Sequence, residues 1–193
     1  MVPELRLEEL PQALAHGQID LAVGVLPNLE TGFRHEPLLE ETYVCIVRDT
    51  HPVLRRKLTR EAFAKLRHAS FTSMNNAHRA IVETLERAGI RRHVAAEVPH
   101  FVVIPILIAN SDLVVILPRT IAEWFSRFLD LRVLDLPFPL PSFEVRSHWH
   151  ERRETDAGLR WLRGLVRDAV AALRRRGAKP DIGRGDRLDR EMR

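Results

Sequence analysis

The sequence predicts an α/β fold with two lobes, because one short pattern occurs in it twice. Residues 17–27 read GQIDLAVGVLP and residues 109–118 read ANSDLVVILP; in each copy an Asp precedes a short apolar run that ends in Leu-Pro. Such a run, rich in β-branched residues and bounded by turn residues and Pro, is typical of a strand buried on both faces of a parallel sheet. Each run follows a helical stretch. Two such units, about 90 residues apart, predict two lobes with a cleft between them.

Length and composition are those of a globular chain. The 193 residues, 45% of them hydrophobic, suffice for one large domain or two small lobes. No apolar run is long enough to span a membrane, and the start, MVPELR, lacks the apolar core of a signal peptide, so we expect a cytoplasmic protein. Cys45 is the only cysteine and lies in an apolar stretch. It predicts a buried structural thiol and excludes internal disulfides and cysteine-based zinc sites.

The net charge of +4 comes from the C-terminal end, because Lys and Arg outnumber Asp and Glu after residue 143 and not before it. The run RRR at 174–176 closes a predicted helix, where cations meet the negative end of the helix dipole. We interpret this run as a solvated helix end rather than as a nucleic-acid contact. Almost no apolar residues follow Gly177, so residues 176–193 are predicted to be a disordered tail.

The first predicted elements are one helix and two strands. Apolar residues at helical spacing predict a helix over 9–16, with Pro11 in its first turn and Gly17 as its stop. The apolar run over 19–25 predicts the first strand. Residues 41–47, rich in β-branched and aromatic side chains, predict the second strand.

Helices and strands then alternate through the middle of the chain. Thr59 is a suitable N-cap for a short amphipathic helix, and residues 69–71 form a short strand candidate. Capping residues at 72–76 precede a helix over 77–88, which Gly89 ends. The next segments are predicted, in order, as strand, helix, strand, helix and strand: 94–98, 103–109, 113–117, 121–128 and 131–136.

The last part of the chain predicts a connector, a strand and a long helix. Residues 137–141 read PFPLP and cannot join a sheet interior, because proline lacks the N–H donor that the ladder needs. Residues 143–149 predict a strand, and residues 156–175 a helix. The apolar residues expected to face inward from this helix are Leu159, Leu162, Val166, Val170 and Leu173.

Four segments together carry a family resemblance. They are LPQALAHGQIDLAVG at 10–24, LLEETYVCIVRDTHPV at 38–53, IPILIANSDLVVILPR at 104–119, and an ending with HWHER at 148–152 and WLR at 161–163. In order and spacing they resemble the effector-binding region of LysR-type transcriptional regulators. The ending resembles the branch that includes nodulation regulators and regulators of aromatic catabolism. The resemblance runs from about Leu7 to Leu173.

The resemblance implies two Rossmann-like lobes, as in type 2 periplasmic binding proteins, joined by two crossover strands. These crossovers are expected near Tyr43–Val47 and Phe143–Trp149. Residues 1–47 plus 146–175 would form the first lobe, which is incomplete, and residues 48–145 the second. In the family, a winged helix-turn-helix, a linker helix and the first strand and helix of the first lobe come earlier.

Nothing before Gly17 leaves room for those parts, so the resemblance implies an N-terminally truncated chain. We therefore expect DNA contact only through a helix-turn-helix that this chain lacks. The absent first helix lies at the family's dimer interface. The homo-oligomer typical of the family is accordingly left open for this chain.

The expected ligand site lies where strands end and helices begin, because helix N-termini present free N–H groups there. Residues 24–27 leave the first predicted strand, and residues 72–76 cap the helix that is predicted to begin at residue 77. Hydroxyl and amide donors at such a start suit a carboxylate or a phenolate, although Thr72 and Ser73 could also serve only as caps, and His100 and Phe101 only in packing. The candidate effector-binding residues are Gly24, Val25, Leu26, Pro27, Thr72, Ser73, Met74, Asn75, His100 and Phe101.

Three classes of function fit this pattern unequally. The resemblance implies an effector-sensing domain for a small organic molecule, aromatic or carboxylate. A solute-binding protein shares the fold, but no signal peptide precedes it. An enzyme is the least expected class, because no Gly-x-Ser-x-Gly elbow and no Gly-rich phosphate loop occurs. His148 and His150 could form half of a metal site, but no complementary pair of ligands accompanies them, so we expect no metal, no cofactor and no catalytic residue.

Overall fold

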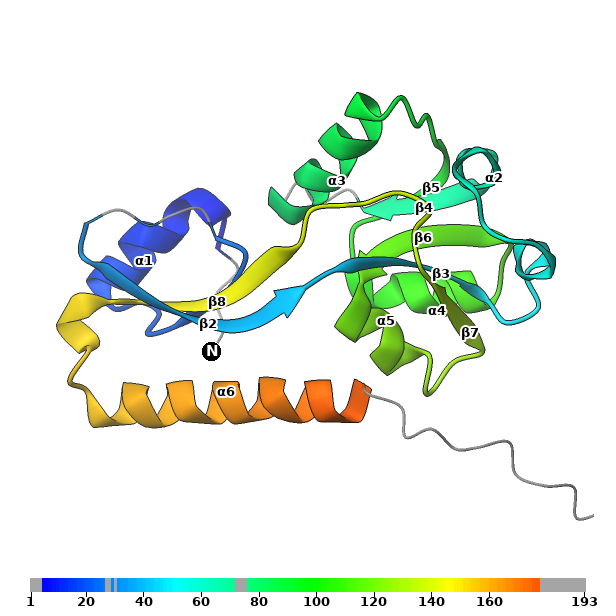
Figure 1. Ribbon diagram of the computed structural model, residues 1–193. Helices are drawn as coiled ribbons and strands as arrows, with labels where there is room; N and C mark the ends of the chain where they lie inside the picture. Colours follow the sequence, from blue (N-terminus) through cyan, green and yellow to red (C-terminus); the bar gives the residue numbers. More distant parts are fainter. Residues whose placement is uncertain (1–4, 27–28, 30, 72–75, 178–193) are drawn as a thin grey trace, which may run out of the picture.

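Two β-sheets joined by two long strands make up the molecule in the computed structural model, which describes residues 5–26, 29, 31–71 and 76–177 (Figure 1). The small sheet has the strand order β1-β8-β2, and the large sheet has the order β5-β4-β6-β3-β7. The chain enters the large sheet from β2 and returns to the small sheet in β8 (Figure 1). The predicted α/β fold of two lobes with two crossovers is thereby confirmed.

The small sheet is antiparallel throughout. Its strands are β1 (Ala22–Gly24), β8 (Phe143–His150) and β2 (Phe33–Glu41). The helices α1 (Leu10–His16) and α6 (Ala157–Gly177) lie on opposite sides of it (Figure 1). A 3-10 turn, η1 (Leu7–Glu9), precedes α1, and another, η4 (Glu151–Arg153), precedes α6.

The helix stop predicted at Gly17 is confirmed. Gly17 has a φ of 72°, in the left-handed region that favours glycine, and its N–H closes the last turn of α1. Pro11 lies in the first turn of α1, as predicted.

The first copy of the repeated pattern is not the fully buried parallel strand that the sequence predicts. β1 has only three residues and pairs antiparallel with β8, with Ala22 opposite His148. Val23 is 49% exposed. In the described part of the chain β1 has one neighbouring strand only, so it is an edge strand. The apolar run could not reveal this, because the number of neighbours of a strand depends on residues far away in the sequence.

Strand β2 is absent from the sequence-based prediction. Its first half is polar, and Pro37 interrupts it. The strand nevertheless pairs with β8 from Phe33 to Glu41, with a register irregularity between Pro37 and Leu39. A proline is tolerated here because β2 lies at the edge of the small sheet and needs only some of its N–H groups for the ladder.

The large sheet is mixed. Strands β4 (Arg67–Phe71), β5 (His93–Val98) and β6 (Leu113–Pro118) are parallel, whereas β3 (Tyr43–Arg48) is antiparallel to β6 and to β7 (Leu131–Leu134). The second copy of the pattern is confirmed as a buried strand, since Leu113 to Leu117 are all buried.

The segment expected near the first crossover, Tyr43–Val47, lies inside β3, between β6 and β7 of the large sheet, and is entirely buried. The chain passes from one sheet to the other at Thr42, between the end of β2 and the start of β3. The division into lobes at residues 47, 48 and 146 stays a prediction.

Helices cover both faces of the large sheet. The helices α2 (Arg60–Ala64) and α3 (Asn76–Arg87) lie on one face, and α4 (Ile104–Ala109) and α5 (Arg119–Phe125) lie on the other. The 3-10 turns η2 (Pro52–Arg55) and η3 (Phe101–Val103) precede α2 and α4. The remaining predicted elements coincide with these and with β4 to β8 to within about three residues at each end.

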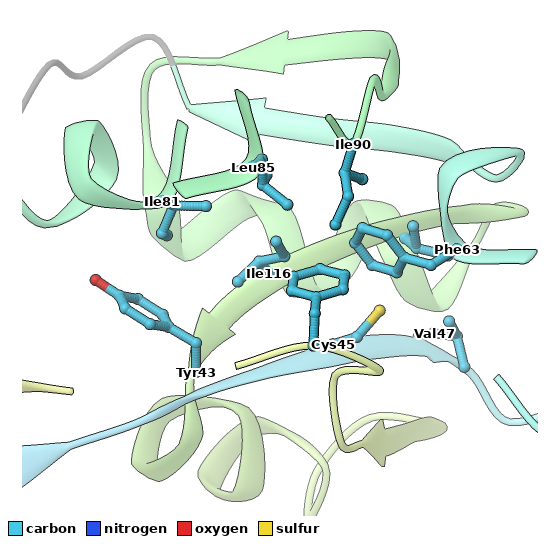
Figure 2. Close-up of a cluster of buried hydrophobic side chains, with 10 residues drawn as sticks. Tyr43, Cys45, Val47, Phe63, Ile81, Leu85, Ile90 and Ile116 are labelled. Atoms are coloured by element: carbon cyan, nitrogen blue, oxygen red, sulfur yellow. The ribbon is translucent and has the colours of Figure 1, made fainter. Parts of the chain in front are cut away.

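Alternation along β3 divides the core between the two faces. Tyr43, Cys45 and Val47 join the cluster under α2 and α3, shown in Figure 2, whereas Val44 and Ile46 join the cluster over α4 and α5. Burial on both faces explains why β3 has no polar side chain before Arg48 apart from the Tyr43 hydroxyl.

The long helix α6 is less buried than the sequence predicts. Leu159 is buried, but Leu173 is exposed, and Leu162, Val166 and Val170 are only partly covered. Trp161 and Leu165 are also exposed. The prediction that Leu173 faces inward is therefore wrong. The tail predicted over 176–193 lies outside the described residues from residue 178 onward. No described helix is long and apolar enough to span a bilayer.

The buried thiol of Cys45 leads to a first prediction. Cys45 is fully buried, and burial raises its pKa to about 12. We expect Ellman's reagent to react with the native chain at pH 8 about a thousandfold more slowly than with a free cysteine, because the thiolate is the reacting form. Absorbance at 412 nm measures the rate. The same chain in urea is the control and should release one equivalent; rapid stoichiometric reaction of the native chain would contradict the burial.

Candidate ligand-binding site

The connections of the large sheet change direction between β4 and β6. From β4 the chain continues through α3 to β5 on one side, and β5 leads through α4 to β6 on the other side. In open α/β sheets, ligands bind outside the carboxyl ends of the strands at such a switch point. Phe71 at the end of β4 and Pro118 at the end of β6 therefore mark the candidate site.

The two strands separate as they approach this edge. β4 pairs with β6 only at Arg67 and His68; beyond them it pairs with β5 alone, while β6 pairs with β3. The separation leaves a cavity of about 10 Å³, which is enough for one water molecule. A larger ligand has to lie outside the strand ends. The cavity is lined by Ala69, Ser70, Phe71, Ile81, Arg92, Val115 and Ile116.

Arg92 gives this cavity a positive charge. No carboxylate in the described part of the chain forms an ion pair with Arg92, and burial lowers its pKa. Beneath it, His68 is fully buried, and the pKa of its ring falls to about 4, chiefly through burial and also through the nearby charge of Arg92. A guanidinium without a counter-ion at a switch point is suited to an anionic partner.

The small sheet directs its own strand end toward the same space. β8 runs from the large sheet to the small one, and β1 runs antiparallel to it, so β1 ends on the side that faces the large sheet. Gly24 ends β1, and Val25 and Leu26 follow; all three are partly buried. Pro27 lies outside the described residues.

The second predicted segment is only partly described. Thr72, Ser73, Met74 and Asn75 lie outside the described residues; the residues that flank them are the end of β4 and the start of α3. His100 is exposed and follows β5, and Phe101 begins η3. Because β5 is parallel to β4, both strands end at the same edge of the sheet.

Sequence reasoning missed an apolar patch at this edge. Val102, Val103 and Ile106 are exposed at the start of α4, whereas Ile104 and Ile108 are buried beneath the sheet. Exposed apolar side chains grouped beside strand ends are typical of the wall of a ligand site. Apolar residues on both faces of the predicted helix over 103–109 were the available signal, but from the sequence we predict only a helix there.

A buried carboxylate at the same edge was also missed. Glu41, the last residue of β2, is 4% exposed and accepts hydrogen bonds from the backbone N–H of Thr120 at 3.2 Å and from its hydroxyl. Burial raises the pKa of Glu41, and the two hydrogen bonds oppose that shift. Both residues lie where the chain passes between the sheets, since Thr120 is in the first turn of α5.

The histidines of β8 are held in packing contacts. His148 is buried beside His35, with ring centroids 5.8 Å apart, and His150 lies edge-on to Phe33 at 5.2 Å. Among the described residues no group of three or more His, Cys, Asp or Glu side chains could hold a metal ion.

An open hollow of about 390 Å³ lies at the opposite edge of the large sheet, where β3 ends. Its single arginine, Arg48, is already paired with Asp112 at 2.7 Å. The charge of this hollow is thus largely satisfied within the chain, unlike that of Arg92.

Two α/β lobes joined by two crossing strands, with strand ends of both directed to the space between them, define the type 2 periplasmic-binding-protein-like fold. Comparison with known families narrows this class. Residues 4–171 match the family described as the LysR substrate binding domain, and the chain belongs to that family.

The relatives of this chain include transcriptional regulators. The transcriptional activator NahR of Pseudomonas putida is 38% identical over 159 residues, which are 82% of this chain and 53% of NahR. The regulatory domain of MexT, an activator in Pseudomonas aeruginosa, is 25% identical with a TM-score of 0.70, over 82% of this chain and 78% of that chain. The effector-binding domain of QuiR in complex with shikimate shares the fold at 14% identity and a TM-score of 0.67, over 88% and 79% of the two chains.

The chain spans about half the length of the curated relatives that it matches. Those relatives are LysR-type regulators and not enzymes, so the prediction of a regulatory, non-enzymatic domain is confirmed. Membership of this family also favours the regulator over the solute-binding protein, the other class with this fold.

Proposed function

We propose that this chain is an effector-sensing domain that binds a small aromatic or carboxylate molecule between its two lobes. The observation that carries the proposal is Arg92, a partly buried cation that lines the cavity at the switch point of the large sheet and forms no ion pair with any described residue. The patch of Val102, Val103 and Ile106, beyond the carboxyl end of β5, suits the apolar part of such a molecule. The shikimate bound by QuiR, itself a carboxylate, is consistent with this chemistry.

The ligand would act by shifting a population of lobe orientations. A molecule that contacts both Gly24–Leu26 and the strand ends of the large sheet binds more tightly when the lobes are closer, so it favours the closed state. We propose that this shift reaches DNA in the cytoplasm through a helix-turn-helix outside this chain, as the names of the relatives suggest. Assembly into homo-oligomers is proposed for the longer regulator only.

A thermal-shift screen with benzoates, phenols, dicarboxylates and shikimate tests the proposal. A ligand at a hundred times its Kd should raise Tm by about 5–10 °C, because binding to the folded chain alone stabilises it. We expect carboxylates among the hits. Arg92→Met should abolish the shifts caused by carboxylates and spare those caused by neutral phenols.

The double variant Thr72→Ala/Ser73→Ala tests the placement of the site. It should lose most of the ligand-induced shift, because the proposal assigns ligand contacts to the hydroxyl groups of these two residues, which precede α3 in the sequence. Thr155→Ala, at an exposed position next to α6, is the matched control and should respond like the native chain. Unchanged shifts in the double variant would overturn this assignment of the site.

A further inference from the structure

Glu41 and Thr42 attach the passage between the sheets to the start of α5. The carboxylate of Glu41 accepts two hydrogen bonds from Thr120, and the carbonyl oxygen of Thr42 accepts one from the N–H of Arg119 at 2.8 Å. On its other side Glu41 is paired with Phe143, the first residue of β8. Both strands that join the lobes therefore meet at this one point.

Helix α5 is also in contact with the other lobe. It packs against α6, which lies on the small sheet (Figure 1). Helix α6 is held on that sheet by Arg163, whose guanidinium lies 2.6 Å from the carboxylate of Glu36 in β2. If the angle between the lobes changes, one of two contacts must therefore change. Either α5 moves relative to α6, or the lobe-connecting passage at Glu41 and Thr42 moves relative to α5.

Glu41 is an unusual residue for a purely structural cap. It forms no ion pair within the described residues, and Arg119 is instead directed to Asp135 at 2.5 Å and Glu123 at 3.5 Å. A carboxylate buried without a cation is destabilising unless its hydrogen bonds are kept. The contact with Thr120 therefore has one favourable geometry, and a shift of either partner leaves the carboxylate unsatisfied.

We propose that Glu41 is a positioning residue whose contact with Thr120 sets the resting angle between the two lobes. The contact holds the lobe-connecting passage on α5 and so limits the orientations that the lobes sample without a ligand. This inference deepens the proposed function, because the interlobe angle is what a bound effector would change. Its test needs no effector, so it can fail or succeed independently of that function.

The distance between the lobes can be measured with two spin labels, at Gln18→Cys and Arg91→Cys, in the full chain. Both positions are exposed, and the native Cys45 is buried and should not be labelled. Pulsed electron resonance should give a narrow distance distribution for the native chain. Thr120→Val removes one hydrogen bond of the contact and Glu41→Ala removes both, so both variants should give a broader distribution.

Conservative variants separate positioning from simple loss of structure. Thr120→Ser keeps the hydroxyl. Glu41→Gln keeps the shape and one oxygen that can accept from the Thr120 N–H, while its NH2 group can donate to the Thr120 hydroxyl, so both variants should retain the narrow distribution. In Glu41→Ala, the amide hydrogen of Thr120 should exchange about tenfold faster, as expected for the loss of one hydrogen bond. Exchange is measured residue by residue, so it reports on the contact even if a variant is less stable overall.

Ser142→Ala is the matched control. The Ser142 hydroxyl donates to the carboxylate of Glu40 at 3.1 Å, on the exposed side of the same connecting strands. Its loss should change neither the distribution nor the exchange of Thr120. The inference is overturned if Thr120→Val and Glu41→Ala keep the native distance distribution, or if Ser142→Ala broadens it to the same extent.

Discussion

Replacing Arg163 by Met should lower the free energy of unfolding by about 3 kcal/mol, because it breaks a nearly buried ion pair and leaves one charge behind. The guanidinium of Arg163 lies 3.6 Å above the ring of Trp149 and 2.6 Å from Glu36. It also lies 3.5 Å from Glu154, which accepts a hydrogen bond from the indole of Trp149 at 2.6 Å. Urea denaturation followed by circular dichroism measures the loss.

Two variants of the same helix sharpen this prediction. Arg160→Met removes an exposed arginine one turn earlier and should change stability by less than about 0.5 kcal/mol. Arg163→Lys keeps the charge but not the planar, two-pronged group, and should recover only part of the loss. Arg167 lies 3.4 Å from Glu36 and can compensate in part. A loss for Arg163→Met no larger than that for Arg160→Met would show that the network contributes little.

Acidification from pH 6.5 to 4 should destabilise the chain by up to about 3 kcal/mol through His68 alone. The ring of His68 is fully buried, with Nε2 3.0 Å from the carbonyl oxygen of Phe63, to which neutral histidine can donate. Its Nδ1 has no hydrogen-bond partner among the described residues. Burial, together with the charges of Arg92 and His93 and against the hydrogen bond to Phe63, lowers the pKa of His68 from 6.5 to about 4.

The sign follows from proton binding. The unfolded chain takes up a proton near pH 6.5, whereas the folded chain resists it until about pH 4. The contribution of neutral His68 to the stability of the fold is therefore fully present above pH 6.5, and it is lost as the pH falls from 6.5 to 4. His148, whose pKa is also lowered by burial, contributes in the same direction.

Urea midpoints at several pH values for the native chain and for His68→Leu test this account. The variant should lose clearly less stability between pH 6.5 and 4, whatever its stability at neutral pH, while His148 leaves it with a residual slope. Equal losses in the two chains would contradict the assignment of the pH dependence to His68.

Local signals in the sequence were sufficient for most of the elements. Gly17 ends α1, Thr59 caps α2 by accepting a hydrogen bond from the N–H of Ala62, and the apolar run of 113–117 forms the buried strand β6. These features depend on residues that are neighbours in the chain, such as a cap, a turn or a side-chain period. They could therefore be predicted without knowledge of the fold.

Pairing between distant strands could not be predicted in the same way. The run at 19–25 resembles that at 113–117, yet it contains a three-residue edge strand with Val23 exposed, because it has a single strand neighbour in the described chain. β2 was missed because its polar residues and Pro37 are typical of a loop, and only its pairing with β8 makes it a strand.

The candidate site also combines features that the sequence predicts with features that only the structure reveals. The sequence, with the resemblance it carries, predicted which strand ends and helix starts could face the ligand, and β1 and β4 do end toward the space between the sheets. It did not distinguish Arg92 or Glu41 from the many other charged residues. These two residues differ from the other charged residues in their burial and in their hydrogen-bond or ion-pair partners. Such partners can be remote in the sequence, since Thr120 is 79 positions from Glu41.

The sequence by itself thus determined most of the elements, because propensity, capping and periodicity are properties of contiguous residues, and its four characteristic segments determined the family. Only the tertiary structure decided which strands are edges, which charges are buried and which residues join the two lobes. Those properties arise from contacts between segments far apart in the chain, such as that of Arg163 with Glu36 across 127 positions.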